Sequence, residues 1–133
     1  MTELNKRLGS MDYDGLIADI YPKLVVSGPI RKLAEAATIK RGTILAKSSG
    51  TSGDGKLVVL GTAATGDEVL TANCILCDDV DVGTADDVTA PVYLMGCFNS
   101  NKVTVADSYA MTEADKDALR NGGIVFKAAA PAL

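Results

Sequence analysis

Residues 50–56, GTSGDGK, have glycines and a lysine at the spacing of a phosphate-binding loop. Such a loop also needs a Ser or Thr after the lysine to hold magnesium, and it must lead into a helix. Here residues 57–60, LVVL, follow with the pattern of a strand. Because Asp54-Gly55 is typical of a hairpin turn, we interpret this segment as a turn between two strands and predict no nucleotide site.

Cys74 and Cys77 have the CxxC spacing that zinc sites and redox proteins use. Zinc needs four ligands, but the sequence adds only Cys97 and has no histidine. A redox pair lies at the N-terminus of a helix, where the helix dipole lowers the thiol pKa, and no helix is expected here. In a strand the two thiols would point to opposite faces. We therefore predict reduced structural thiols and no metal.

Residues 78–89, DDVDVGTADDVT, form an acidic segment that begins like a calcium-binding loop. In a motif that begins at Asp79, the glycine should stand at the sixth position, but Gly83 is the fifth, and the glutamate should stand at the twelfth, where this chain has Ala90. We interpret the segment as a solvated acidic loop without a cofactor, and weak surface binding of a divalent cation is the alternative. The carboxylates concerned are Asp78, Asp79, Asp81, Asp86 and Asp87.

Composition argues against several classes of function. The 133 residues include no histidine, which removes the commonest general base, and we predict that the protein is not an enzyme. The net charge is −4 and there is no basic stripe with interleaved aromatic residues, so we expect no nucleic acid partner. No apolar run approaches the roughly 20 residues of a membrane-spanning helix, so we expect no membrane partner.

The elements that would position these segments are short strands and one helix. A helix should begin at Thr112, whose hydroxyl can cap the first turn, and end at Gly122-Gly123. We expect Val92, Leu94 and Phe98 to share one strand face, with a bulge at Gly96, and a turn at residues 27–29. The expected strands are residues 23–26, 31–34, 43–47, 57–60, 69–77, 90–98, 103–105 and 124–127.

The fold class that this pattern predicts is α+β and mainly β, a compact domain with one C-terminal capped helix and an extended N-terminal arm. Residues 1–29 are assigned to the arm and residues 30–133 to the domain. The arm carries apolar side chains that would either pack back on their own domain or dock on a partner. Those that we assign to a partner-binding site are Leu16, Ile17, Ile20, Tyr21 and Pro22.

Four stretches in order resemble the head decoration proteins of lambda-like bacteriophages. Residues 31–47, RKLAEAATIKRGTILAK, contain a KRGT turn before an apolar strand, and residues 75–81 are an apolar strand that ends in DVD. Residues 90–99, APVYLMGCFN, resemble the family's tyrosine-leucine-glycine-phenylalanine strand, and residues 117–127 resemble its closing helix and strand. The resemblance covers residues 31–127, and the stretch before residue 30 is a departure from it.

This resemblance implies a non-enzymatic cement protein that binds the outer surface of the expanded head and stabilises the shell. Its partners would be the major capsid protein and itself, as a homotrimer at three-fold positions. It would be made in the cytoplasm of the host bacterium and located in the virion. Two alternatives stay open: a small β-barrel ligand-binding or enzymatic domain that uses the acidic loop or the Gly-rich turn, and a scaffold module of a non-viral complex.

Overall fold

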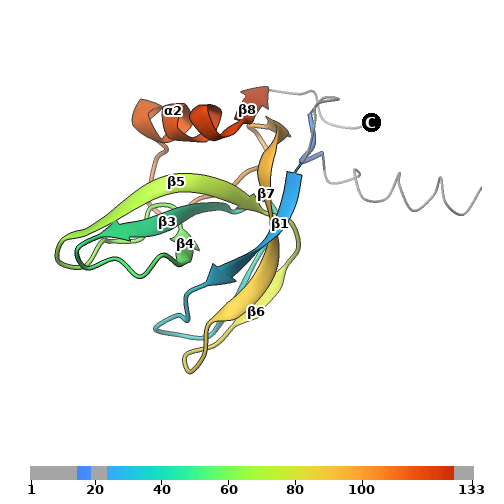
Figure 1. The fold of residues 1–133 in the computed structure, drawn as a ribbon. Helices are drawn as coiled ribbons and strands as arrows, with labels where there is room; N and C mark the ends of the chain where they lie inside the picture. Colours follow the sequence, from blue (N-terminus) through green and yellow to red (C-terminus); the bar gives the residue numbers. More distant parts are fainter. Residues whose placement is uncertain (1–14, 19–23, 128–133) are drawn as a thin grey trace, which may run out of the picture.

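The computed structural model describes residues 15–18 and 24–127 (Figure 1). Within these residues the chain is mainly β, which confirms the predicted class. The elements in chain order are β1 (Leu24–Ile30), β2 (Ala37–Ile39), β3 (Ile44–Gly50), β4 (Leu57–Val59), β5 (Glu68–Leu76), β6 (Val80–Val82), β7 (Val88–Asn99), α2 (Glu113–Gly122) and β8 (Ile124–Lys127).

The main sheet curls into a barrel because its first strand pairs twice. The strand order is β1-β4-β3-β5-β7-β8, and β1 also pairs with β7, which closes the ring of five strands. β8 runs parallel to the end of β7 outside this ring. β2 and β6 form a separate antiparallel pair below the barrel (Figure 1). Since β1 lies in the sheet, residues 24–29 of the expected arm belong to the barrel.

Two clusters of buried side chains occupy opposite faces of the sheet. Ile44 and Ala46 lie in the first cluster and Leu45, between them, lies in the second, as alternation along β3 requires. The expectation that Val92, Leu94 and Phe98 share a face is wrong, because Phe98 packs in the first cluster and the other two in the second. Leu94 has no partner on β1, because Leu24 is opposite Met95 and Val25 is opposite Tyr93. This irregularity shifts the later side chains of β7 to the opposite face of the sheet.

The helix begins and ends where its sequence signals predicted. The Thr112 hydroxyl accepts a hydrogen bond from the Asp115 N–H at 3.2 Å, and the Asp115 carboxylate accepts one from the Thr112 N–H at 3.0 Å. Both bonds satisfy groups that the helix itself leaves unpaired. Gly123, with φ of 107°, ends the helix in the left-handed conformation and leads directly into β8.

Three expected local structures are wrong. Residues 27–29 continue β1 and form no turn, and a side chain at Gly28 would collide with Leu57. Residues 31–34 form no strand, because the Lys32 N–H is bonded to the Asp87 carboxylate and the Leu33 N–H to the Gly83 carbonyl. In place of the strand at residues 103–105 there is a single bridge from Thr43 to Thr104.

Candidate functional site

The described part of the N-terminal segment, residues 15–18, is called the arm root here and joins the end of β7 (Figure 1). The Ala18 N–H donates to the Cys97 carbonyl at 3.0 Å, and the Asn99 N–H donates to the Leu16 carbonyl at 2.7 Å. Ile17 forms an antiparallel bridge with Phe98. The arm root is thus attached to the barrel through its backbone as well as its side chains.

Leu16 is 1% exposed and belongs to the first core cluster, and Ile17 packs against the same cluster. For these two residues of the sequence-predicted site, packing back on the domain is what the structure shows. Ile20, Tyr21 and Pro22 lie outside the described residues. No local pattern predicted the burial of Leu16, because its neighbours in space come from distant parts of the chain.

The KRGT turn holds the arm root in place. Gly42 has φ of 92°, and a Cβ there would lie 3.0 Å from the Lys102 carbonyl oxygen and 3.4 Å from Leu16 Cδ1. Only glycine allows the turn to approach both groups with this backbone. The Gly42 N–H donates to the Leu76 carbonyl at 2.9 Å, and its carbonyl accepts from Thr104 at 3.1 Å. A signature of the resemblance therefore packs against the arm.

Arg41 of the same turn binds the barrel wall. Its Nη1 donates to the Cys77 carbonyl at 2.7 Å and to the Tyr93 hydroxyl at 3.1 Å. Its guanidinium carbon lies 5.7 Å from the centroid of the Tyr93 ring, within the range of a cation–π interaction. Burial raises the pKa of the Tyr93 hydroxyl. These contacts make Arg41 a structural residue of the turn.

Exposed apolar side chains lie at the start of β1. Leu24 and Val25 are 48% and 49% exposed, and with Val69 at 52% they are the large exposed hydrophobic residues of the described chain. Leu24 is opposite Met95 and Val25 is opposite Tyr93 in the ladder with β7. This exposed pair directly follows Ile20, Tyr21 and Pro22 in the sequence. It extends the candidate partner-binding region to residues that sequence analysis missed.

The Gly-rich segment is the turn between β3 and β4, as predicted, and its charged side chains bind protein groups. Arg31 Nε and Nη2 donate to the two oxygens of the Asp54 carboxylate at 3.0 and 2.9 Å. Arg31 also pairs with Glu68, and Lys56 pairs with Asp87. The hydrogen bonds from Arg31 lower the pKa of Asp54 to about 2. Lys56, the lysine of the phosphate-loop pattern, is thus engaged by a carboxylate.

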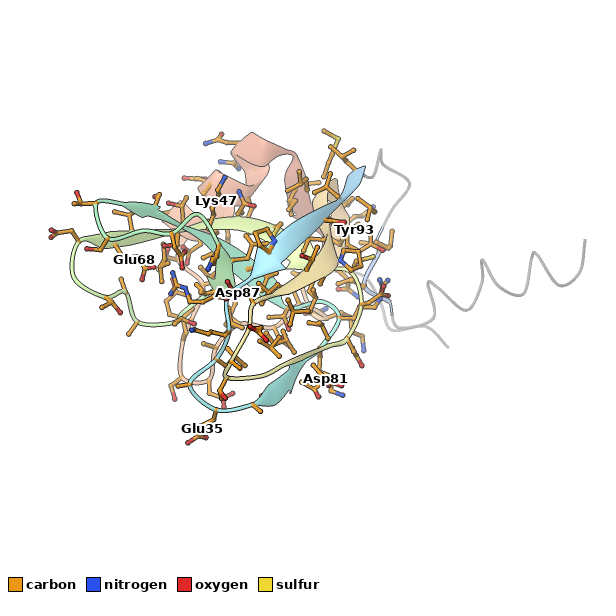
Figure 2. The ribbon with its side chains drawn as sticks, turned by 60° about the horizontal axis from the view of Figure 1, so that its bottom comes forward. Glu35, Lys47, Glu68, Asp81, Asp87 and Tyr93 are labelled. Carbon is orange, nitrogen blue, oxygen red and sulfur yellow. The ribbon has the colours of Figure 1, made fainter. Side chains whose placement is uncertain are left out.

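The acidic segment is partly a strand, since β6 lies within it. Its carboxylates bind separate protein donors: Asp79 accepts from the Arg41 N–H at 2.7 Å, and Asp81 accepts from the Thr38 hydroxyl at 2.5 Å. Figure 2 shows Asp81 and Asp87 well apart. In residues 15–18 and 24–127, no three His, Cys, Asp or Glu side chains are grouped to hold a metal ion.

The cysteines lie as the strand interpretation predicted. Cys74 packs in the second core cluster and Cys77 against the first, so their thiols are on opposite faces of the sheet. All three cysteines are free. Burial raises the pKa of the Cys74 thiol to about 12, which keeps it protonated and unreactive at neutral pH. The two thiols of the CxxC sequence thus pack separately, one on each face of the sheet.

Together these features define a small β-barrel whose charged groups serve structure, with an apolar N-terminal region beside its family-type turn. Such an architecture is typical of a binding or assembly protein. The model of the family described as bacteriophage lambda head decoration protein D matches residues 31–125. The match spans most of the chain, so the protein belongs to this family and is a component of the phage head. No curated protein matches the sequence significantly.

The match places the chain's role in decoration of the phage capsid, and its location in the virion. The matched residues include the KRGT turn, the Gly-rich turn between β3 and β4, the whole of α2 and the start of β8, and they begin just after β1. The arm root and the exposed pair Leu24 and Val25 precede the matched residues. The described chain holds no helix that is long and apolar enough to cross a membrane.

Proposed function

We propose that this protein is a non-enzymatic cement protein that binds the outer surface of the expanded head and stabilises the shell. It contacts the major capsid protein and assembles as a homotrimer at three-fold positions, after synthesis in the host bacterial cytoplasm. The observation that carries the proposal is the match to the head decoration family over residues 31–125.

The physical basis of cementing is selective binding. A protein that binds the assembled shell and not its dispersed subunits adds a stabilising free energy of RT ln(1 + [L]/Kd) for each bound copy. Many copies on one shell multiply this effect. Shell stability therefore rises with the concentration of free protein, in proportion to its logarithm above Kd.

We assign capsid binding to the N-terminal region. Leu16 and Ile17 anchor this region to the barrel, and Ile20, Tyr21 and Pro22 are the proposed contacts, followed by the exposed Leu24 and Val25. An extended segment can add a strand to the edge of a neighbouring sheet and so span two capsid subunits. Ordering such a segment costs free energy, which apolar contacts at these positions would offset.

The first test is co-sedimentation of the purified protein with expanded heads that lack it. We expect saturable binding to the heads, and light scattering of the free or head-released protein at three times the chain mass of 13.7 kDa. Absence of binding to expanded heads would contradict the capsid role. Binding as a monomer would contradict the trimer alone.

A second test separates the N-terminal region from the barrel. Tyr21→Ala together with Ile20→Ser changes two of the proposed contacts and retains the buried Leu16, so we expect an unchanged thermal transition and weaker head binding. The matched control is Arg120→Ala on the exposed helix, where Arg120 pairs only locally with Asp117, and binding should be unchanged. Equal binding by the double variant and the intact chain would exclude Ile20 and Tyr21 as capsid contacts.

A further inference from the structure

The barrel closes on its first strand by two very different seams. β1 pairs with β7 along its whole length, from Leu24 opposite Met95 to Ile30 opposite Val88. β1 meets β4 in one pair only, Ile30 opposite Leu57. One further backbone bond, from the Arg31 N–H to the Leu57 carbonyl at 2.9 Å, completes this β1–β4 seam. A short parallel contact of this kind contributes few ladder bonds to closing the barrel.

Side-chain ion pairs cross the β1–β4 seam where the ladder is missing. Arg31, directly after β1, binds both oxygens of Asp54 in the turn before β4. On the same side of β4, Lys56 pairs with Asp87, which lies directly before β7 and also accepts the Lys32 N–H at 2.8 Å. The first pair thus joins the turn before β4 to the end of β1, and the second joins it to the start of β7. Figure 2 shows Asp87 beside this crossing.

Glu68 connects the seam to the barrel interior. Its side chain is 2% exposed and accepts hydrogen bonds from the Ser48 hydroxyl, from Arg31 and from the Thr65 N–H at 3.2 Å. Arg31 is its cationic partner. A buried carboxylate is held in place only while its charge is matched, so the position of Arg31 is tied to the ionised state of Glu68. Ile30 and Leu57 are buried at the same seam.

We propose that the β1–β4 seam is an acid-sensitive opening built into the barrel, closed by charge pairing where β1–β7 is closed by a backbone ladder. Protonation of the seam carboxylates separates β4 and its turn from β1, while β1 stays paired with β7. The charged groups that face one another at this seam are Arg31, Lys32, Asp54, Lys56, Glu68 and Asp87.

The direction of the effect follows from the carboxylate pKa values. The pKa of Asp54 is lowered to about 2 by Arg31, that of Glu68 is lowered by Ser48 and Arg31, and that of Asp87 is lowered by Lys56. A carboxylate with a lowered folded-state pKa contributes stability above its ordinary pKa, near 4, and loses it as the pH falls through the folded value. The seam therefore stays closed at neutral pH and opens between about pH 4 and pH 2.

Hydrogen exchange of backbone amides tests the proposal. The Arg31 amide reports on the β1–β4 seam, and the β1 amides bonded to β7 report on the ladder. Between pH 6 and pH 3 we expect protection of the Arg31 amide to fall at least about tenfold relative to the β1–β7 amides. An equal change in both sets, or no change in either, would overturn the proposal.

Charge-neutral variants make the test independent of global acid unfolding. At pH 6, Asp54→Asn and Asp87→Asn should each lower protection of the Arg31 amide by up to about fivefold and leave the β1–β7 amides unchanged. Glu68→Gln should do the same if it folds, and the other two variants decide the matter if it does not. The control is Asp117→Asn, which removes an exposed pair on α2 and should change neither set. Unchanged Arg31 protection in Asp54→Asn and Asp87→Asn would refute the assignment.

Discussion

The arm root and the β1–β4 seam are each joined to the barrel by a single β pair, Ile17 with Phe98 and Ile30 with Leu57. The arm root is then secured by burial of Leu16, whereas the seam, where Ile30 and Leu57 are also buried, adds ion pairs around Arg31. Each region has one β pair, and side-chain burial stabilises the first while ion pairs help to stabilise the second. Attachment by burial responds to side-chain volume, and attachment by charge responds to pH.

The largest expected effect is at the arm root. Leu16→Ala should lower the free energy of unfolding by about 2–5 kcal/mol, because it leaves a cavity in the first core cluster. Urea denaturation measures this loss, which should be the same at pH 6 and at pH 4. Val69→Ala, at an exposed position, is the control and should change stability by less than about 0.5 kcal/mol. A similarly small effect of Leu16→Ala would show that the arm root is not part of the core.

The turn that contacts Leu16 gives the next effect. Gly42→Ala should destabilise the protein by about 1–3 kcal/mol, because φ is positive and the added Cβ meets the Lys102 carbonyl. Gly55→Ala is a matched control, since φ there is 75° and open space surrounds the position. The difference in stability loss between the two variants, measured by thermal denaturation, separates the effect of the Lys102 contact from that of the backbone strain. Equal losses would mean that the close approach contributes nothing.

The seam should show a smaller effect that depends on pH. Asp54 is partly exposed, so Asp54→Asn should cost at most about 1 kcal/mol at pH 6. Because the pKa of Asp54 is lowered to about 2, the intact chain should lose this contribution between about pH 4 and pH 2, and the variant should have less to lose. Urea titrations across this range measure how steeply the free energy of unfolding falls with pH. The same slope in both proteins would contradict a charge-closed seam.

The smallest expected effect is the coupling between the two regions. Leu16 and Asp54 share no partner, so the double variant Leu16→Ala with Asp54→Asn should be additive within about 0.5 kcal/mol. Equilibrium denaturation of the four proteins completes the cycle. A larger coupling energy would mean that the arm root and the seam act as one unit.

Local signals in the sequence predicted much of the fold. Asp54-Gly55 located the turn between β3 and β4, and Thr112 and Gly123 located the two ends of the helix. These signals depend on groups within a few residues of one another, which is why sequence analysis finds them. The family signature was found in the same way, through the KRGT turn and the strands around it.

The missed features all depend on contacts between distant segments. β2 pairs with β6 from the acidic segment, and Leu16 packs beside Gly42. In both cases the partners are far apart in the sequence, so the residues next to each of them do not reveal the contact. Glu68 was not selected because a carboxylate at the start of a strand looks exposed until Arg31 and Ser48 are placed beside it. The exposure of Leu24 and Val25 likewise depends on where the barrel ends.

Thermal opening of expanded heads, followed by light scattering with and without the purified protein, tests the cementing role most directly. We expect the opening temperature to rise with the concentration of free protein, in proportion to its logarithm above Kd. The variant Tyr21→Ala with Ile20→Ser should require more protein to reach the same opening temperature. Heads that bind the protein to saturation and still open at the same temperature as heads without it would contradict the cementing role.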